Sequence, residues 1–444
     1  MEPTPRQELD RSVEELASAK ARWVATGIPR RTLLLKRAIA DTLEGAPEMV
    51  RDACRAKGLD SRGPGAAEDW LGGPLTTLRN FRLLVRSLRE IGAGGRTELR
   101  KDAIRRRPDG QIAVEVFPVG AKEKILSAGF RAEVWMEPGV AEEDLPRTMA
   151  RAYQPDFPRA GKVALVLGAG NVASIGPTDV LYKLFNENQV AVLKMNPVND
   201  YLGLHVERGL AAFIEEGVLR VVYGGAAEGD HLVRHPGVDE IHITGSAAVH
   251  DAIVWGPPGP EQEAAKREHR PKTTKRVTSE LGCVTPVLVV PGEWTERELA
   301  FQAENVATMV ANNASFNCNA AKVLVTAQGW PQRKAFLEAL AATLASLPAR
   351  RAYYPGTDRK YDAFLAAHPE ARPLAKRTEG VIPWTLIEGV DPSRPDDIVF
   401  NQEAWCGVLA ETALPARDPG EYLEAAVEFA NDRVWGTLSA SVLV

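Results

Sequence analysis

The chain has 444 residues, of which 45% are hydrophobic and 25% are charged, a composition typical of a soluble globular protein. Its formal net charge of -5 argues against a nucleic-acid partner or an anionic membrane surface. No apolar run approaches the roughly 20 residues that a membrane-spanning helix needs, and the polar N-terminus lacks the features of a secretory signal.

The first 110 residues are predicted to be mainly helical. We expect one helix over 11–45 and a second, amphipathic helix over 74–91. The pattern then changes, because 112–117 and 132–136 have the composition of strands and are separated by Gly120 and a lysine-rich turn. Two strands joined in this way predict a hairpin or arm.

From Lys162 onward, predicted strands and helices alternate. The expected strands are 163–167, 190–193, 219–223 and 240–243, and the expected helices are 177–186, 201–216 and 227–234. This alternation predicts a parallel sheet with right-handed crossovers. The stretch 256–274, rich in Pro, Gly, Glu and Lys, is expected to be a surface insertion, and a strand at 287–290 with a helix at 294–314 begins a second α/β region.

The candidate metal ligands do not form a recognisable site. The four cysteines are scattered and form no CxxC pair, which argues against a disulfide framework and a cysteine zinc site. His231 and His235 have helical i, i+4 spacing, but the glutamate of an HExxH motif is missing between them. We therefore predict no metal, free thiols and a cytoplasmic location.

Two motifs at strand ends suggest a nucleotide site. Residues 168–173, Gly-Ala-Gly-Asn-Val-Ala, fit the relaxed dinucleotide pattern G-x-G-x-x-G/A between a strand and a helix. The acidic residue expected after the second strand is replaced by Lys194, which can bind ribose hydroxyls or a 2'-phosphate. Thr244-Gly245-Ser246 would let a helix N-terminus approach a diphosphate. A glycine turn and an ordinary serine cap are the alternatives.

Two further motifs contain candidate catalytic side chains. Glu280 lies beside a glycine in Ser-Glu-Leu-Gly, although a solvated surface glutamate would fit this pattern as well. Cys318 lies in the polar, small-residue stretch 312–322, so its thiol is expected to be exposed enough to react. A buried structural cysteine is the alternative, and the asparagines on both sides of Cys318 argue against it.

The order and spacing of these motifs resemble the aldehyde dehydrogenase superfamily over nearly the whole chain. The interval from Asn171 to Lys194 matches the one between the family's substrate-oxygen Asn and its cofactor Lys. The matching segments are 243–246 (the family's Phe-Thr-Gly-Ser), 279–283 (Leu-Glu-Leu-Gly-Gly), Cys318 (the nucleophile), 401–407 (Glu-x-Phe-Gly-Pro, with Glu403 on its Glu) and 436–442 (Gly-Leu-Ser-Ala-Ser-Val).

The resemblance implies an α/β fold with a parallel-sheet, Rossmann-like cofactor domain, an α/β catalytic domain and a small β-hairpin oligomerisation arm. We expect the NAD(P)-binding domain at 1–110 and 139–281, the arm at 111–138 and the catalytic domain at 282–444. Family members continue beyond the Ser-Ala-Ser-Val strand, so the catalytic domain is expected to be truncated at its C-terminus. A full-length protein would be expected to form a homodimer or tetramer.

The resemblance also implies NAD(P)-dependent oxidation of an aldehyde to a carboxylic acid through a thioester. Cys318 would attack the carbonyl, Asn171 and the Cys318 N–H would hold the oxyanion, and Glu280 would activate water or take the thiol proton. The implied cofactor is NAD or NADP, and its implied binding residues are Lys194, Gly225, Gly245, Ser246 and Glu403.

Some residues depart from the family pattern and keep other functions open. Pro197 stands where many NAD-selective members have a Glu, which leaves NAD and NADP as alternatives. Cys283 replaces the second Gly of Leu-Glu-Leu-Gly-Gly, and we interpret it as a buried structural thiol. The run from Cys318 to Lys322 is closer to acyl-CoA and acyl-phosphate reductases. A coenzyme-A-acylating dehydrogenase or acyl-CoA reductase is therefore the first alternative, and an inactive nucleotide-binding homologue is the second.

Overall fold

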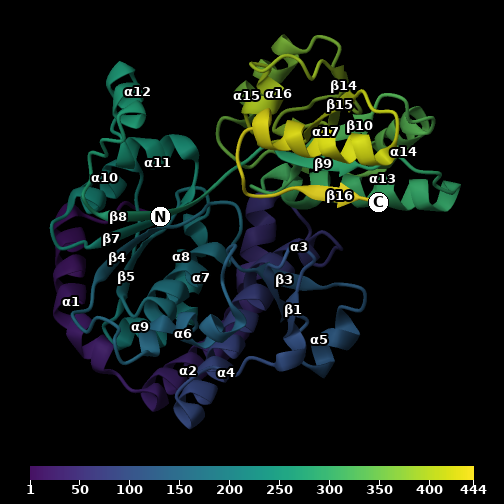
Figure 1. Cartoon of the computed structure of the whole chain (residues 1–444). Helices are drawn as coiled ribbons and strands as arrows, with labels where there is room; N and C mark the ends of the chain where they lie inside the picture. The colour runs from purple at the N-terminus through teal and green to yellow at the C-terminus, as the bar shows by residue number, and fades with distance from the viewer.

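The computed structural model describes residues 1–444 and contains two large sheets in separate lobes (Figure 1). The sheet of the first lobe is parallel throughout. Its strands run in the order β6 (Leu219–Val222), β5 (Val190–Lys194), β4 (Val163–Leu167), β7 (Glu240–Gly245) and β8 (Arg276–Leu281). The predicted α/β fold with a Rossmann-like parallel sheet is thus confirmed.

The strand order determines where this sheet can bind a ligand. Successive strands run outward from β4 to β5 and β6, and the chain then returns to place β7 and β8 on the other side of β4. In open parallel sheets, ligands bind at the carboxyl ends of the strands where the order reverses. Here that point lies between β4 and β7.

Helices cover both faces of the sheet. α1 (Arg6–Ala25) and α10 (Ala226–Arg234) pack on one face, and α7 (Ile175–Leu181) packs on the other (Figure 1). A continuous buried apolar core joins this sheet to the N-terminal helices. The other helices of the lobe are α2 (Ile28–Lys57), α3 (Ala66–Trp70), α4 (Thr76–Gly94), α6 (Leu145–Thr148), α8 (Gly203–Gly209), α9 (Ala211–Glu215), α11 (Ala247–Val254) and α12 (Pro260–Arg267).

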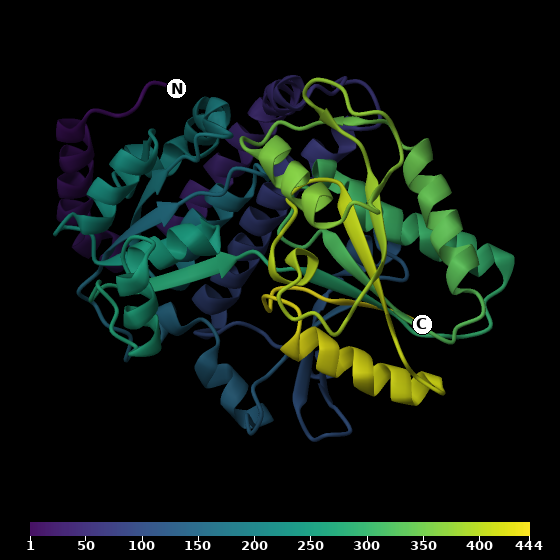
Figure 2. The ribbon, with the colours of Figure 1, turned by 90° about the horizontal axis from the view of Figure 1, so that it is seen from above.

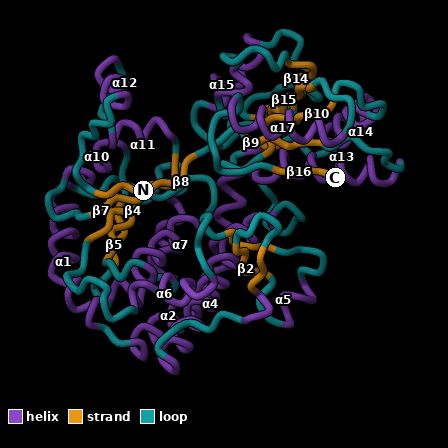
Figure 3. The backbone as a smooth tube through the Cα atoms, in the orientation of Figure 1, coloured by secondary structure: helices purple, strands orange, loops and turns teal.

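Three predicted segments differ in detail from the structure. The helix expected over 11–45 is two helices, because Pro29 lies in the first turn of α2, where proline is tolerated, and could not continue α1. The helix expected over 201–216 is interrupted at Leu210 (φ -107°), between α8 and α9. The insertion 256–274 contains α12, which projects beyond the sheet (Figure 3).

A small antiparallel sheet forms the arm. Its strands are β1 (Ile104–Arg106), β2 (Ile112–Phe117) and β3 (Ala132–Trp135), with α5 (Ala121–Leu126) between β2 and β3. The apolar side chains of Ile125, Leu126 and Phe130 are largely exposed here. The oligomerising role of 111–138 stays a prediction.

The second lobe surrounds a six-stranded sheet (Figure 2). All neighbours are parallel except β12, in the order β12 (Arg372–Pro373), β14 (Thr385–Val390), β15 (Val408–Leu414), β10 (Ala321–Ala327), β9 (Thr285–Val289) and β16 (Ser441–Leu443). Its helices are α13 (Glu296–Ala311), α14 (Arg333–Ser346), α15 (Thr357–Ala367), α16 (Ile398–Asn401) and α17 (Pro419–Asp432), and β11 (Arg350–Arg351) pairs with β13 (Val381–Ile382). None of the helices has the length and apolar composition needed to cross a membrane.

Candidate active site

One cavity of about 1320 Å³ lies between the two lobes. Small-molecule pockets usually measure about 300–1,000 Å³, so this cavity has room for a dinucleotide together with a small substrate. All eight residues predicted for the site line it: Asn171, Lys194, Gly225, Gly245, Ser246, Glu280, Cys318 and Glu403. The structure therefore brings together residues that lie as much as 232 positions apart in the chain, from Asn171 to Glu403.

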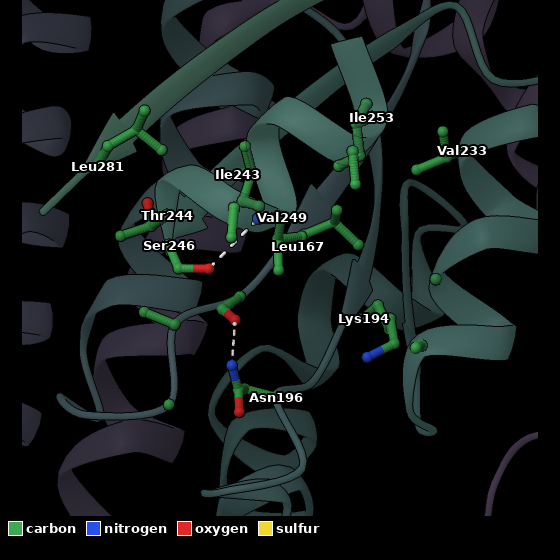
Figure 4. A pocket seen from close by; sticks show the side chains of 18 of the residues that line it. Leu167, Lys194, Asn196, Val233, Ile243, Thr244, Ser246, Val249, Ile253 and Leu281 are labelled. Atoms are coloured by element: carbon green, nitrogen blue, oxygen red, sulfur yellow. Dashed lines mark hydrogen bonds between the residues drawn. The ribbon is translucent and has the colours of Figure 1, made fainter. Parts of the chain in front are cut away.

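Lys194 lines this cavity from the first lobe (Figure 4). It is the last residue of β5 and is buried, and its Nζ donates to the Met195 carbonyl at 3.3 Å. Burial lowers the pKa of this ammonium group, and Lys194 has no carboxylate within ion-pair distance. A buried lysine that faces a cavity without a salt bridge is suited to hydroxyl or phosphate oxygens.

Ser246 and the start of α11 lie across the same cavity. The Ser246 Oγ accepts a hydrogen bond from the Val249 N–H at 3.3 Å, so this serine caps the helix (Figure 4). Gly245 and Ser246 nevertheless line the cavity, together with Ala248 and Val249 of the first turn of α11. Gly225 differs, because its N–H already donates to Glu228 Oε2 at 2.6 Å. Its amide is therefore not free for a ligand.

The glycine motif after β4 contacts the second lobe through Tyr354. A Cβ at Gly170 would lie 2.8 Å from the Tyr354 hydroxyl and 2.7 Å from Asn196 Oδ1, so a side chain at this position would force both groups to move. Burial raises the pKa of Tyr354 to about 12, which keeps its hydroxyl protonated at neutral pH. Tyr354 could not be predicted as a site residue from the sequence, because it belongs to no local motif.

The loop before Cys318 has an unusual backbone. The predicted helix 294–314 ends at Ala311, and the next turn contains Asn313, Ala314 and Ser315 with φ of 51°, 55° and 68°. L-residues rarely adopt this left-handed conformation, so neighbouring groups must stabilise it. The Asn313 N–H donates to Glu68 at 3.1 Å, and its side-chain amide donates to the Asn171 carbonyl at 3.0 Å.

Asn171 contacts the same loop with its side chain. It is buried, and its Nδ2 donates to the Phe316 carbonyl at 2.9 Å. A side-chain amide has two N–H bonds, so one of them stays available for a second acceptor. Asn171 is thus linked to the backbone just before the thiol and can donate into the cavity.

Cys318 is half-buried and lies among charged groups of both signs. Burial raises the pKa of its thiol above the ordinary range, and the carboxylates of Glu280 and Glu403 raise it further. Lys322 and the Asn319 N–H act in the opposite direction and lower that pKa. At neutral pH the thiol is therefore mainly protonated, and a base is needed to activate it.

Glu280 and Glu403 reach this site from different directions. Glu280 lies near the end of β8 and is exposed, whereas Glu403 is largely buried beside Gly282, at which a Cβ would overlap its carboxylate. Burial raises the pKa of Glu403. Its Oε1 accepts no hydrogen bond, although Lys322 Nζ lies 3.7 Å away. This leaves a buried acceptor for a ligand hydroxyl.

An aromatic cluster forms the wall next to Glu403. The ring of Tyr354 stacks on Phe316 with centroids 5.4 Å apart and meets Trp405 edge to face, also at 5.4 Å. Trp405 has a left-handed φ of 51°, and its indole N–H has no partner. Trp405 was not predicted as a site residue, although it stands two residues after Glu403 in the segment 401–407.

Comparisons with known proteins identify a related family and related folds. Residues 190–359 match the model of the Aldehyde dehydrogenase family. Aldehyde dehydrogenase LUC3 from Fusarium sp is 28% identical over 149 residues, and the match spans 34% of this chain and 27% of the length of that curated relative.

Solved structures share the fold over the whole chain. An aldehyde dehydrogenase from Mycobacterium tuberculosis complexed with NAD+ has 17% identity and a TM-score of 0.67, with 100% of this chain and 79% of that one covered. The glyceraldehyde-3-phosphate dehydrogenase GapN from Methanocaldococcus jannaschii complexed with NADP has 12% identity and a TM-score of 0.67, with 100% and 86% covered. At these identities, the likeness concerns the fold alone.

Proposed function

The chain belongs to the aldehyde dehydrogenase superfamily, and from that premise we propose that it oxidises an aldehyde to a carboxylic acid with NAD or NADP. One observation carries the proposal: a single cavity joins Cys318 and Glu280 to Lys194 and the start of α11. A thiol, a carboxylate and a nucleotide-sized space are the groups that this reaction requires.

The residues on the cofactor side fit a dinucleotide. Lys194 would bind ribose hydroxyls or a phosphate, and the first turn of α11 at Ser246 would face the diphosphate. Glu403 offers a buried oxygen without a hydrogen bond, which suits a ribose hydroxyl. When bound, the nicotinamide accepts the hydride that the substrate loses.

The first half of the reaction would acylate Cys318. Because the pKa of this thiol is raised by burial and by Glu280, a carboxylate must take its proton as the sulfur attacks. A C–S bond forms, and the carbonyl electron pair moves to oxygen, which the Asn171 amide and the Cys318 N–H would stabilise. Return of that pair expels the hydride and leaves a thioester on Cys318.

The second half would release the acid. Glu280 is exposed and lines the cavity, so it can take a proton from water. The water oxygen attacks the thioester carbon, the C–S bond breaks and the thiolate is restored. This role of Glu280 favours water over coenzyme A as the acyl acceptor.

An assay of the full chain tests the proposal. A panel of aldehydes is supplied with NAD+ or NADP+, with and without coenzyme A, and NAD(P)H formation is followed. We expect turnover that does not need coenzyme A. Strict dependence on coenzyme A would replace hydrolysis by thioester transfer, and cofactor binding without any turnover across the panel would overturn the proposal.

A further inference from the structure

Lys322 is a buried lysine next to Cys318 that has no role in the reaction steps proposed above. It is the second residue of β10, which directly follows the loop that contains Cys318, and only 5% of it is exposed. Its Nζ donates to the carbonyl oxygens of Asn317 at 3.2 Å, Cys318 at 3.2 Å and Ala320 at 3.0 Å. One ammonium group therefore binds three carbonyl oxygens within the four residues from Asn317 to Ala320.

The geometry of the peptide group gives these bonds a consequence. The peptide bonds on both sides of Cys318 are trans, and the C=O and N–H of a trans peptide point in opposite directions. A carbonyl of Asn317 held by Lys322 directs the Cys318 N–H away from that lysine. In the same way, the bond to the Cys318 carbonyl directs the Asn319 N–H away.

Both of these N–H groups are therefore directed to the side of the loop opposite Lys322, where they can bind other acceptors. Neither donates to another backbone group. The Asn319 N–H lowers the pKa of the Cys318 thiol, as expected of a donor that faces sulfur. The Cys318 N–H is left for an oxygen bound at the carbon that the thiol attacks.

We propose that Lys322 is a positioning residue: it holds two peptide groups so that the Cys318 N–H meets the substrate oxyanion and the Asn319 N–H meets the thiolate. This inference rests on the proposed function, because it assigns the donors that the acylation step needs. It differs from a general structural role, since it predicts a change in the thiol itself.

The charges around the thiol make the effect of Lys322 measurable. Glu280 comes from β8, Glu403 from the segment after α16, and Cys283 from the segment after β8, where its Sγ lies 3.6 Å from the Cys318 carbonyl. Lys360 on α15 faces Glu403. Glu280 and Glu403 raise the pKa of Cys318 and Lys322 lowers it, so loss of Lys322 removes a counter-charge as well as the three bonds.

The test measures alkylation of Cys318 by iodoacetamide as a function of pH in the full chain, with the modified peptide quantified by mass spectrometry. This readout needs no turnover, so it stays valid even if no aldehyde is oxidised and the proposed function fails. In Lys322→Met we expect the midpoint of the rate profile to move about one pH unit upward, which means roughly tenfold slower alkylation at pH 7. Lys322→Arg keeps the charge and the donors and should largely restore the profile.

Two further variants make the result decisive. Lys334→Met removes an exposed lysine on α14 and should leave the profile unchanged. If the methionine variant does not fold, Lys322→Gln keeps a donor in the same space without the charge, and we expect an intermediate shift. The Ala320 N–H also donates to the Asn317 carbonyl at 3.1 Å, so this turn could hold the peptide alone. A folded methionine or glutamine variant with the wild-type profile would establish that alternative and overturn the role of Lys322.

Discussion

The two sides of the cavity are built by different means. On the side proposed for the cofactor, Lys194 and Gly245 stand at the ends of two strands of the same parallel sheet, and Ser246 begins the helix that follows. On the thiol side, the Cys318 loop is held by side chains that donate to backbone carbonyls, from Asn171 and Lys322. The first side depends on the regular sheet, whereas the second depends on individual long-range hydrogen bonds.

Because of this difference, we expect the thiol side to be the more sensitive to single substitutions. Removing a group at a strand end leaves the ladder of the sheet intact, because the backbone forms that ladder. Removing Asn171 or Lys322 takes away hydrogen bonds to backbone carbonyls of this loop, and a buried carbonyl left without any partner costs roughly 1–3 kcal/mol.

The largest difference is expected between two asparagines. Asn171→Ala removes an oxyanion donor and the bond to the Phe316 carbonyl, so kcat should fall by about 100- to 1,000-fold. Asn196→Ala is the matched control on the cofactor side, where its Nδ2 donates to the Gly168 carbonyl at 3.3 Å. Steady-state kinetics of both folded variants give the comparison, and equal losses in kcat would contradict it.

On the cofactor side, Lys194→Ala should act on cofactor affinity. Loss of a buried ammonium donor to ribose or phosphate oxygens should raise the KM for the dinucleotide by roughly tenfold or more while kcat changes little. Lys272→Ala, at an exposed position on the rim of the same cavity, is the control and should change this KM less. A reduced kcat with unaltered KM would remove Lys194 from the cofactor site.

The charge of Glu280 should have a measurable effect on the pKa of the Cys318 thiol. Burial and then Glu280 raise the pKa of Cys318, so Glu280→Gln should lower that pKa and move the alkylation profile toward lower pH. At pH 7 we expect alkylation to become about threefold faster, while hydrolysis of the thioester becomes slower. Glu293→Gln, at an exposed loop position, is the control. Slower alkylation in Glu280→Gln would mean that this carboxylate does not face the thiol.

The smallest expected effects are changes in the free energy of unfolding, which should have opposite signs for substitutions on the two sides of the cavity. Ser246→Ala removes the cap of α11 and should lower the free energy of unfolding by about 1 kcal/mol. Ser315→Gly relieves a left-handed residue (φ 68°) and should raise it by about 0.5–1 kcal/mol. Urea unfolding of both variants measures the two changes, and a destabilised Ser315→Gly would show that the serine side chain stabilises the loop more than its backbone strains it.

The same contrast explains what the sequence could predict. Lys194 ends an apolar strand and Ser246 follows a second predicted strand, so their place at one edge of the sheet could be inferred from the local pattern. Tyr354 contacts Gly170 from the other lobe, and Asn313 adopts a left-handed φ without being glycine. Such features depend on contacts between distant segments, so no local sequence pattern predicts them.

The boundaries of some elements could not be predicted for a related reason. No glycine or proline follows Ala311 to mark the end of α13 in the sequence. The turn at Asn312 and Asn313 is instead stabilised by hydrogen bonds from Asn313 to Glu68 and to the Asn171 carbonyl. By contrast, Pro29 in the sequence is a local signal for the start of α2.

The covalent role of Cys318 is tested most simply by looking for an acyl group on its sulfur. The full chain is mixed with an aldehyde and NAD+ or NADP+, quenched in acid within a single turnover, and digested for mass spectrometry. We predict that the peptide containing Cys318 gains the mass of the acyl group, and that Cys318→Ala gives neither the adduct nor NAD(P)H. NAD(P)H formed without this adduct, or formed by Cys318→Ala at the wild-type rate, would contradict the central claim that Cys318 is the covalent nucleophile.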